Sequence, residues 1–244
     1  MERQEQAAQR IAERLRRALA RDAAGALAPL PFPLQPNLTP RRLPGLEPVD
    51  LNPPASANPR IAVVTALLVP PVALGSCSPT GGGESVDPHP FDCQVLLIKR
   101  AEHGRYGGWI ALPGGKVEGN ETAQETAIRE LHEELGFNAA DPEHEIRFVG
   151  SLDPAYVPAT NFLIQVLVAV APQTPQITPD PREVAETLGA ELGLFDPRHA
   201  VHVVDVEEQG QLMRYGVIPV PGERRVWGLT ARLLCELASR LAKA

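Results

Sequence analysis

The segment from Leu112 to Phe137 most strongly constrains how this 244-residue chain can fold. Thr122, with Glu125 three residues later, has the pattern of a capping box at the start of a helix. Residues 123–135 contain neither glycine nor proline, and Gly136 can end a helix in the left-handed conformation. The segment therefore predicts a glycine-containing loop followed by a helix of about three to four turns.

One face of this predicted helix concentrates negative charge. Glu130, Glu133 and Glu134 fall on neighbouring positions of the helix surface, where like charges repel. A divalent cation would turn the repulsion into attraction, because Mg²⁺ prefers carboxylate oxygens and keeps substrate phosphates and waters as its other ligands. Arg129 lies four residues before Glu133 and can pair with it. The residues that would anchor the opposite face are apolar: Ala127, Ile128, Leu131 and Leu135. The pattern predicts a divalent-metal site.

The spacing of these residues resembles the Nudix box, G-x5-E-x7-R-E-U-x-E-E-x-G-U, in which U is a bulky apolar residue. The matching positions are Gly115, Glu121 and the run from Arg129 to Phe137, and every fixed position is filled. This resemblance implies an α/β fold, the Nudix-type α/β/α sandwich with a mixed β-sheet between helices. It also implies an enzyme, a diphosphatase that uses Mg²⁺ or Mn²⁺ to hydrolyse a pyrophosphate bond in a small-molecule substrate.

The resemblance implies roles for individual residues. The expected metal ligands are Glu130, Glu133 and Glu134, with the Gly115 carbonyl assisting, whereas Glu121 would support the site without contacting the metal. The strongest catalytic candidates are Glu133 and Glu134, with Arg129 holding a carboxylate in place.

Residues outside the helix complete the expected site. Gly114 and Gly115 would let the backbone bend tightly and approach the substrate. Arg100 and Arg105, just before the box, would hold substrate phosphates, although both would also suit a solvated surface. The general base comes from the box or from a later loop, where Glu183 is the first candidate. Glu186 is the second candidate, and either glutamate could instead be a solvated surface residue.

The substrate class is suggested by looser similarities. LLIKR before the box, TNFLIQVLVAVAP after it, and Trp227–Ala231 near the end resemble the coenzyme A pyrophosphatase branch of the family. Ala101 and Leu112 depart from that branch, which expects serine and phenylalanine there. ADP-ribose or another nucleoside diphosphate or triphosphate is therefore an alternative substrate. A non-catalytic Nudix-fold nucleotide-binding regulator is the alternative of another class.

Composition limits the partners. The formal net charge of −7 argues against a general nucleic-acid or anionic-membrane surface. No apolar run approaches the roughly 20 residues that cross a bilayer. Cys77, Cys93 and Cys235 are scattered without metal-ligand spacing, which favours reduced thiols and a cytoplasmic protein.

The chain divides into residues 1–59, an N-terminal helix and proline-rich connector, and residues 60–244, the Nudix domain. We expect the helix, over residues 4–22, to pack on the domain or on a second subunit in a homodimer, and the connector to run extended over the surface. Residues 183–194 suit strand or helix, 196–200 a helical turn, and 70–91 a loop. The predicted strands are 61–69, 93–99, 146–152, 162–170, 201–206 and 213–219, and a last helix covers 229–241.

Overall fold

The computed structural model of the chain describes residues 2–54, 58–70, 89–138, 141, 145–208 and 210–242. The loop predicted over residues 70–91 lies outside these ranges except at its ends, and so does Cys77. Cys93 and Cys235 are buried free thiols, as expected for reduced cysteines.

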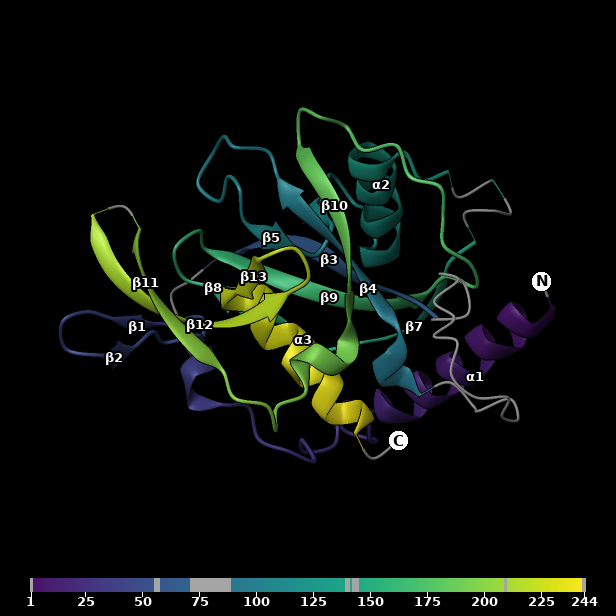
Figure 1. Ribbon diagram of the computed structural model, residues 1–244, viewed down its shortest axis with the longest axis horizontal. Helices are drawn as coiled ribbons and strands as arrows, with labels where there is room; N and C mark the ends of the chain where they lie inside the picture. Colours follow the sequence, from purple (N-terminus) through teal and green to yellow (C-terminus); the bar gives the residue numbers. More distant parts are fainter. Residues whose placement is uncertain are drawn as a thin grey trace.

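An eight-stranded mixed sheet forms the centre of the molecule (Figure 1). The strands β3 and β9 run parallel to each other, and all other pairs in this sheet are antiparallel. In spatial order the main strands are β10 (Val184–Glu191), β4 (Gln94–Arg100), β3 (Arg60–Val69), β9 (Phe162–Val170) and β7 (Arg147–Ser151). Three short strands attach to them: β5 (Ile110–Ala111) to β4, β6 (Gly114–Lys116) to β3, and β8 (Ala155–Val157) to β9.

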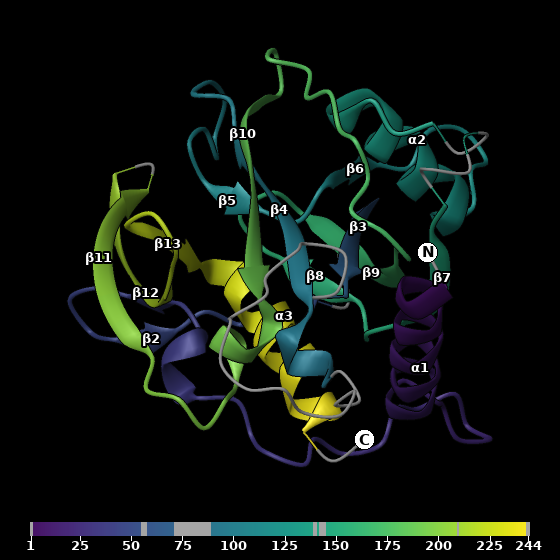
Figure 2. The same cartoon turned by 45° about the vertical axis from the view of Figure 1, so that its right-hand side comes forward.

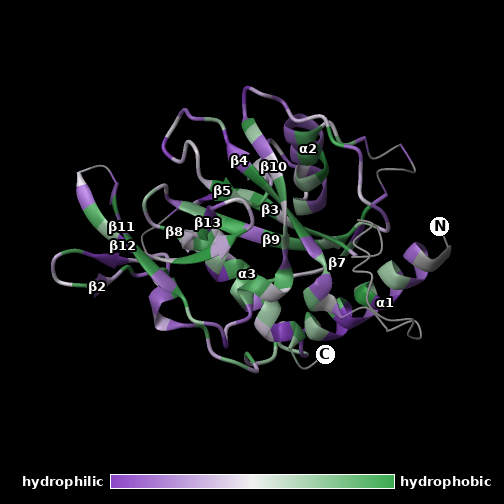
Figure 3. Ribbon diagram, in the orientation of Figure 1, coloured by the Kyte–Doolittle hydropathy of each residue, from purple (hydrophilic) through white to green (hydrophobic). Residues whose placement is uncertain are grey.

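Helices cover both faces of this sheet. Leu67 and Val69 of β3 pack in one apolar cluster with Leu131 and Leu135 of α2 (Ala123–Leu135). The alternate residues of β3 point to the other face, where α1 (Glu2–Ala18) and α3 (Gly228–Leu241) complete a second cluster. The central strands β3 and β9 are strongly hydrophobic because both of their faces are covered (Figure 3). The predicted α/β/α sandwich is thereby confirmed.

A second, five-stranded sheet lies beside the first (Figure 2). It consists of β11 (His202–Glu208), β12 (Gln211–Val220), β13 (Arg224–Trp227) and the short strands β1 (Arg41–Arg42) and β2 (Glu47–Pro48). The connector was predicted to run extended over the surface, and β1 and β2 are extended and lie at the surface, but their pairing was not predicted. They pair with each other, and Arg41 pairs with Arg214 of β12, so backbone hydrogen bonds hold this part of the proline-rich segment in the sheet.

Most other predicted elements occur within one or two residues of the expected bounds. The ambiguous segment 183–194 is a strand, β10, followed by a 3-10 helix at Leu192–Phe195. The helical turn predicted at 196–200 was wrong, because the backbone of Asp196 is not helical, with φ of −56° and ψ of 120°. Its side chain accepts the Arg198 N–H in a turn that follows the 3-10 helix.

The N-terminal helix α1 ends at Ala18 rather than at residue 22. Its Ala8, Ile11 and Leu15 are fully buried in the same apolar cluster as α3 and the large sheet. The division of the chain at residue 59 stays a prediction. Among the described residues, no helix is both long and apolar enough to cross a membrane.

Candidate active site

The acidic helix α2 begins and ends with the predicted caps. The Thr122 hydroxyl accepts the Glu125 N–H at 3.3 Å, and the Glu125 carboxylate accepts the Thr122 N–H at 2.7 Å. At the other end Gly136 is left-handed, with φ of 69°, and its N–H bonds to the carbonyls of the last turn. These caps fix the helix relative to the preceding loop, so its carboxylates have defined positions.

The glycines at the start of the loop allow two close backbone contacts. Gly114 has φ of 144°, and a Cβ there would lie 2.1 Å from the Val63 carbonyl oxygen. A Cβ on Gly115 would lie 2.3 Å from Oε1 of Glu130. The predicted need for glycine is therefore explained by contacts within the protein: Gly114 packs against β3, and Gly115 packs against a helix carboxylate.

Two of the predicted metal ligands are buried behind these glycines. Glu134 is 1% exposed, and its Oε2 accepts the Gly114 N–H at 2.9 Å. Burial raises the pKa of Glu134 to about 8, and it also raises the pKa of Glu130. The Arg100 guanidinium lies beside Glu134, with 3.7 Å between Nη1 of Arg100 and Oε1 of Glu134. Burial thus opposes ionisation of both carboxyl groups, and the nearby arginines offset it only in part.

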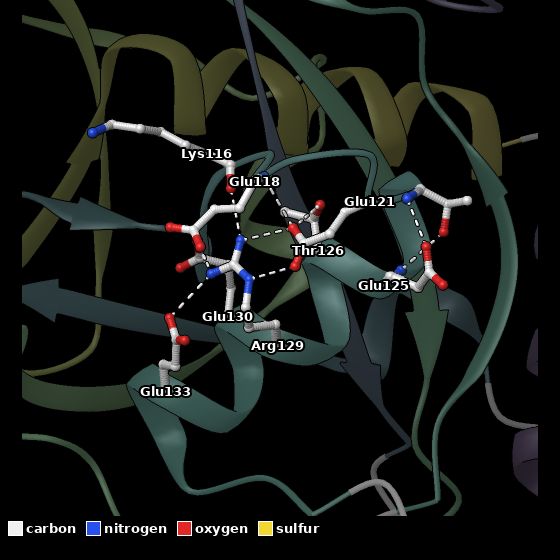
Figure 4. A network of polar contacts seen from close by, with 9 residues as sticks. Lys116, Glu118, Glu121, Glu125, Thr126, Arg129, Glu130 and Glu133 are labelled. Atoms are coloured by element: carbon white, nitrogen blue, oxygen red, sulfur yellow. Dashed lines mark hydrogen bonds and ion pairs between the residues drawn. The ribbon is translucent and has the colours of Figure 1, made fainter.

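Arg129 is the centre of the polar network on the outer side of the helix (Figure 4). Its Nε donates to Glu121 at 2.8 Å, and its Nη2 donates to the Lys116 carbonyl at 2.7 Å. Its Nη1 contacts Glu130 at 2.9 Å and Glu133 at 3.1 Å, which is the predicted pairing of Arg129 with a box carboxylate. The guanidinium lowers the pKa of Glu121 to about 2, so Glu121 supports this network as a fixed anion.

The arrangement fits a divalent cation in part. Within the described ranges, the acidic, histidine and cysteine side chains form no group of three or more that could share one ion. Glu133 is half-exposed and directed to Arg129, which also contacts Glu130. Glu130 and Glu134 nevertheless suit a hard cation, since both are buried carboxylates, and the charge on Glu130 raises the pKa of Glu134. The full ligand set, including Glu133 and the Gly115 carbonyl, stays a prediction.

A cavity of about 870 Å³ opens beside Gly114 and Gly115. Arg100, Arg105 and Glu183 line it, so the structure brings these predicted residues to one space. Arg105 also donates to the Ala159 carbonyl, which ties it to the rim of the cavity.

The two candidates for the general base differ in their surroundings. Glu183 lies close enough to the buried pair that its charge raises the pKa of both Glu130 and Glu134. Its carbonyl accepts the Ala101 N–H at 2.8 Å, which clamps its backbone against the loop after β4. Glu186 instead forms an ion pair with Arg224. The geometry thus favours Glu183, which lines the cavity, over Glu186, whose carboxylate is held by Arg224.

Part of the cavity lining is aromatic, and the sequence did not predict it. Trp109 packs at 5.0 to 5.8 Å, ring centre to ring centre, from Tyr106, Tyr215 and Trp227. We call these four residues the aromatic cluster. They come from the loop before β5 and from β12 and β13, which lie side by side in Figures 1 and 2. Only 5% of the chain is aromatic, and Trp109 and Trp227 are far apart in the sequence, so no local pattern predicted that they would meet.

Known proteins resemble the chain over different lengths. It is 27% identical over 145 residues to a peroxisomal coenzyme A diphosphatase of Caenorhabditis elegans, covering 58% of each chain. It is 49% identical over 45 residues to an ADP-ribose pyrophosphatase of Methanocaldococcus jannaschii, covering 18% of this chain and 26% of the other. A Nudix hydrolase 3 of Caenorhabditis elegans is 48% identical over 50 residues, 20% of this chain and 21% of that protein. The chain thus spans less than two thirds of these relatives.

Among solved structures, a MutT/nudix family protein from Enterococcus faecalis matches 79% of this chain and 65% of its own, with a TM-score of 0.47 and 18% identity. The model of the NUDIX domain matches residues 87–214, more than half of the chain. This range contains the capped helix α2, the glycine loop and the buried glutamates. The chain therefore belongs to the NUDIX family.

Proposed function

We propose that this protein is a diphosphatase that cleaves a pyrophosphate bond in a nucleoside diphosphate derivative, with Mg²⁺ or Mn²⁺ as cofactor. The observation that carries the proposal is the buried pair Glu130 and Glu134, which contacts Gly115 and Gly114. These two glycines line a cavity together with Arg100 and Glu183. Burying two neighbouring carboxylates is costly for a purely structural role, even with Arg129 paired to Glu130 and Arg100 beside Glu134. The same pair is well suited to hold a cation against a polyanionic substrate.

Each residue then has a defined task. A divalent cation would supply neutralisation of the phosphate charge and a bound water of lowered pKa. Glu130 and Glu134 would hold it, with Glu133 and the Gly115 carbonyl as the further predicted ligands. Arg100 is partly exposed on the cavity wall and would bind a substrate phosphate. Glu183 would take the proton from the attacking water.

Coenzyme A or an acyl-coenzyme A is the favoured substrate, and its cleavage gives 3′,5′-ADP and (acyl) phosphopantetheine. The support is the similarity to the coenzyme A diphosphatase, which extends over 58% of the chain. The cavity, at about 870 Å³, also lies within the upper range typical of small-molecule sites. ADP-ribose is the second candidate, because the archaeal ADP-ribose pyrophosphatase is more similar over its shorter match.

The test is turnover by the purified protein with Mg²⁺ or Mn²⁺, measured on coenzyme A, ADP-ribose, NADH and nucleoside triphosphates. We expect coenzyme A to give the highest kcat/KM, with 3′,5′-ADP as a product. Coenzyme A among the poorest substrates would refute the favoured assignment and leave the diphosphatase chemistry intact. Binding without turnover of any of them would instead support a regulatory module.

A further inference from the structure

The turn before β10 carries Glu183 and is tied to the end of the acidic helix α2. The Thr178 N–H donates to the Leu135 carbonyl at 2.7 Å. The Asp180 N–H donates to the Glu134 carbonyl at 3.0 Å, and the Asp180 carbonyl accepts the Glu183 N–H at 3.0 Å. One side of the turn is therefore fixed, through backbone hydrogen bonds, to the helix that holds the buried glutamates.

The other side of the turn is held by the loop between β4 and β5. Nε2 of His103 in this loop lies 2.6 Å from the Arg182 carbonyl oxygen. A carbonyl oxygen only accepts hydrogen bonds, so Nε2 carries a hydrogen and donates it, whether the ring is neutral or charged. The Ala101 N–H holds the next carbonyl, that of Glu183, at 2.8 Å. The bond from His103 is made by a side chain, so a substitution can remove it without changing the backbone.

The loop that carries His103 is itself closely packed. The Gly108 N–H donates to the Arg100 carbonyl at 3.1 Å, which closes the loop at its base. A Cβ on Gly107 would lie 2.7 Å from the carbonyl carbon of Glu102, so the chain folds back tightly beside His103. The imidazole therefore extends from a well-defined support, and its bond joins the loop next to Arg100 to the turn before β10.

From these contacts we infer that His103 is a positioning residue for Glu183. Glu183 is exposed at the cavity, so the place of its carboxylate depends on the backbone that carries it. A general base must lie within hydrogen-bond reach of the proton it takes, and a shift of about 1 Å can lower a rate by about 100-fold. His103 acts through the Arg182 carbonyl and needs no contact with the reacting atoms. The inference rests on the proposed function, in which Glu183 takes the proton from the attacking water.

The test is a set of variants of the full chain, assayed with Mg²⁺ on coenzyme A or on whichever of the other substrates the unmodified protein cleaves fastest. His103→Leu removes the donor, whereas His103→Gln places an amide N–H at a similar reach and keeps it. Each is also combined with Glu183→Gln, which removes the base. His103 is exposed, so neither replacement disturbs the core. His202→Leu is the matched control, because His202 is an exposed residue of β11 outside the cavity lining.

We expect His103→Leu to lower kcat about three- to thirtyfold and to change KM less than about twofold. His103→Gln should recover most of the loss, and His202→Leu should leave both constants unchanged. In proteins that carry Glu183→Gln, His103→Leu should lower kcat no further, because the side chain that it positions no longer serves as a base. Hydrogen exchange needs no turnover, and at the Ala101 and Glu183 amides it should be faster in His103→Leu than in the unmodified protein.

An unchanged kcat in His103→Leu, an equal loss in the presence of Glu183→Gln, or unchanged exchange at both amides would overturn the inference. A rise in KM alone would also overturn it and assign His103 to substrate binding. Full activity of Glu183→Gln would refute the base and its positioning together, and would leave the diphosphatase chemistry intact. The absence of turnover of every substrate by the unmodified protein would refute the proposed function itself, and this inference with it.

Discussion

At the scale of single residues, Glu134 is the most informative position. It is 1% exposed and accepts the Gly114 N–H, and glutamine can keep both the shape and that hydrogen bond. We expect Glu134→Gln to lower kcat at least about 100-fold, because it removes a ligand charge. Its Tm should be nearly unchanged at about pH 5, where the folded protein keeps this carboxyl protonated. Gln124→Glu is the matched control, since it changes the charge by one unit at an exposed position of the same helix. Activity of Glu134→Gln close to that of the unmodified protein would refute the metal assignment.

The same carboxyl group predicts how stability depends on pH. Its pKa is raised from 4.5 to about 8 by burial, so between these values the folded state binds more protons than the unfolded state. The free energy of unfolding in EDTA should therefore fall as the pH rises from about 5 to 8. Glu134→Gln should flatten this decline, and excess Mg²⁺ should reduce it by favouring the charged form. Urea titrations at several pH values would measure the free energy of unfolding. If the free energy of unfolding of Glu134→Gln declines equally steeply with pH, the decline is caused by other groups.

At the scale of elements, the capping box of α2 is a local feature with a measurable contribution. Thr122→Ala removes the side-chain acceptor for the Glu125 N–H and should lower the free energy of unfolding by about 1 kcal/mol. Thr122→Ser keeps the hydroxyl and should recover most of the loss. Urea unfolding followed by circular dichroism would compare the three proteins. A loss in the serine variant as large as in the alanine variant would argue against the cap.

Elements that depend on local signals could be predicted, and those that depend on distant pairing could not. The caps of α2 and the apolar strand β9 depend on residues that are close together in the sequence. The hairpin of β1 and β2 joins a sheet through the pairing of Arg41 with Arg214 of β12. These two residues are far apart in the sequence, so no short-range pattern predicts their pairing. The candidate site was predicted around its helix and at Arg100, Arg105 and Glu183, and these three residues line the cavity. The aromatic cluster joins residues distant in sequence and became visible only in the fold.

At the scale of the whole molecule, the N-terminal helix belongs to the common core. Ile11 is fully buried in the apolar cluster that contains α3 and one face of the large sheet. We expect Ile11→Ala to reduce the free energy of unfolding by about 2–5 kcal/mol. Arg16→Ala, exposed on the same helix, is the control and should change it by less than about 0.5 kcal/mol.

Unfolding of Ile11→Ala followed by two probes also tests whether residues 1–59 and 60–244 fold as one unit. Both tryptophans lie in the cavity, away from α1, so their emission reports on the body of the protein. If α1 folds together with both sheets, the midpoints from tryptophan emission and from far-ultraviolet circular dichroism will shift by the same amount in Ile11→Ala. An unchanged emission midpoint would show that residues 1–59 unfold as a separate unit, and the cavity would then keep its structure without them.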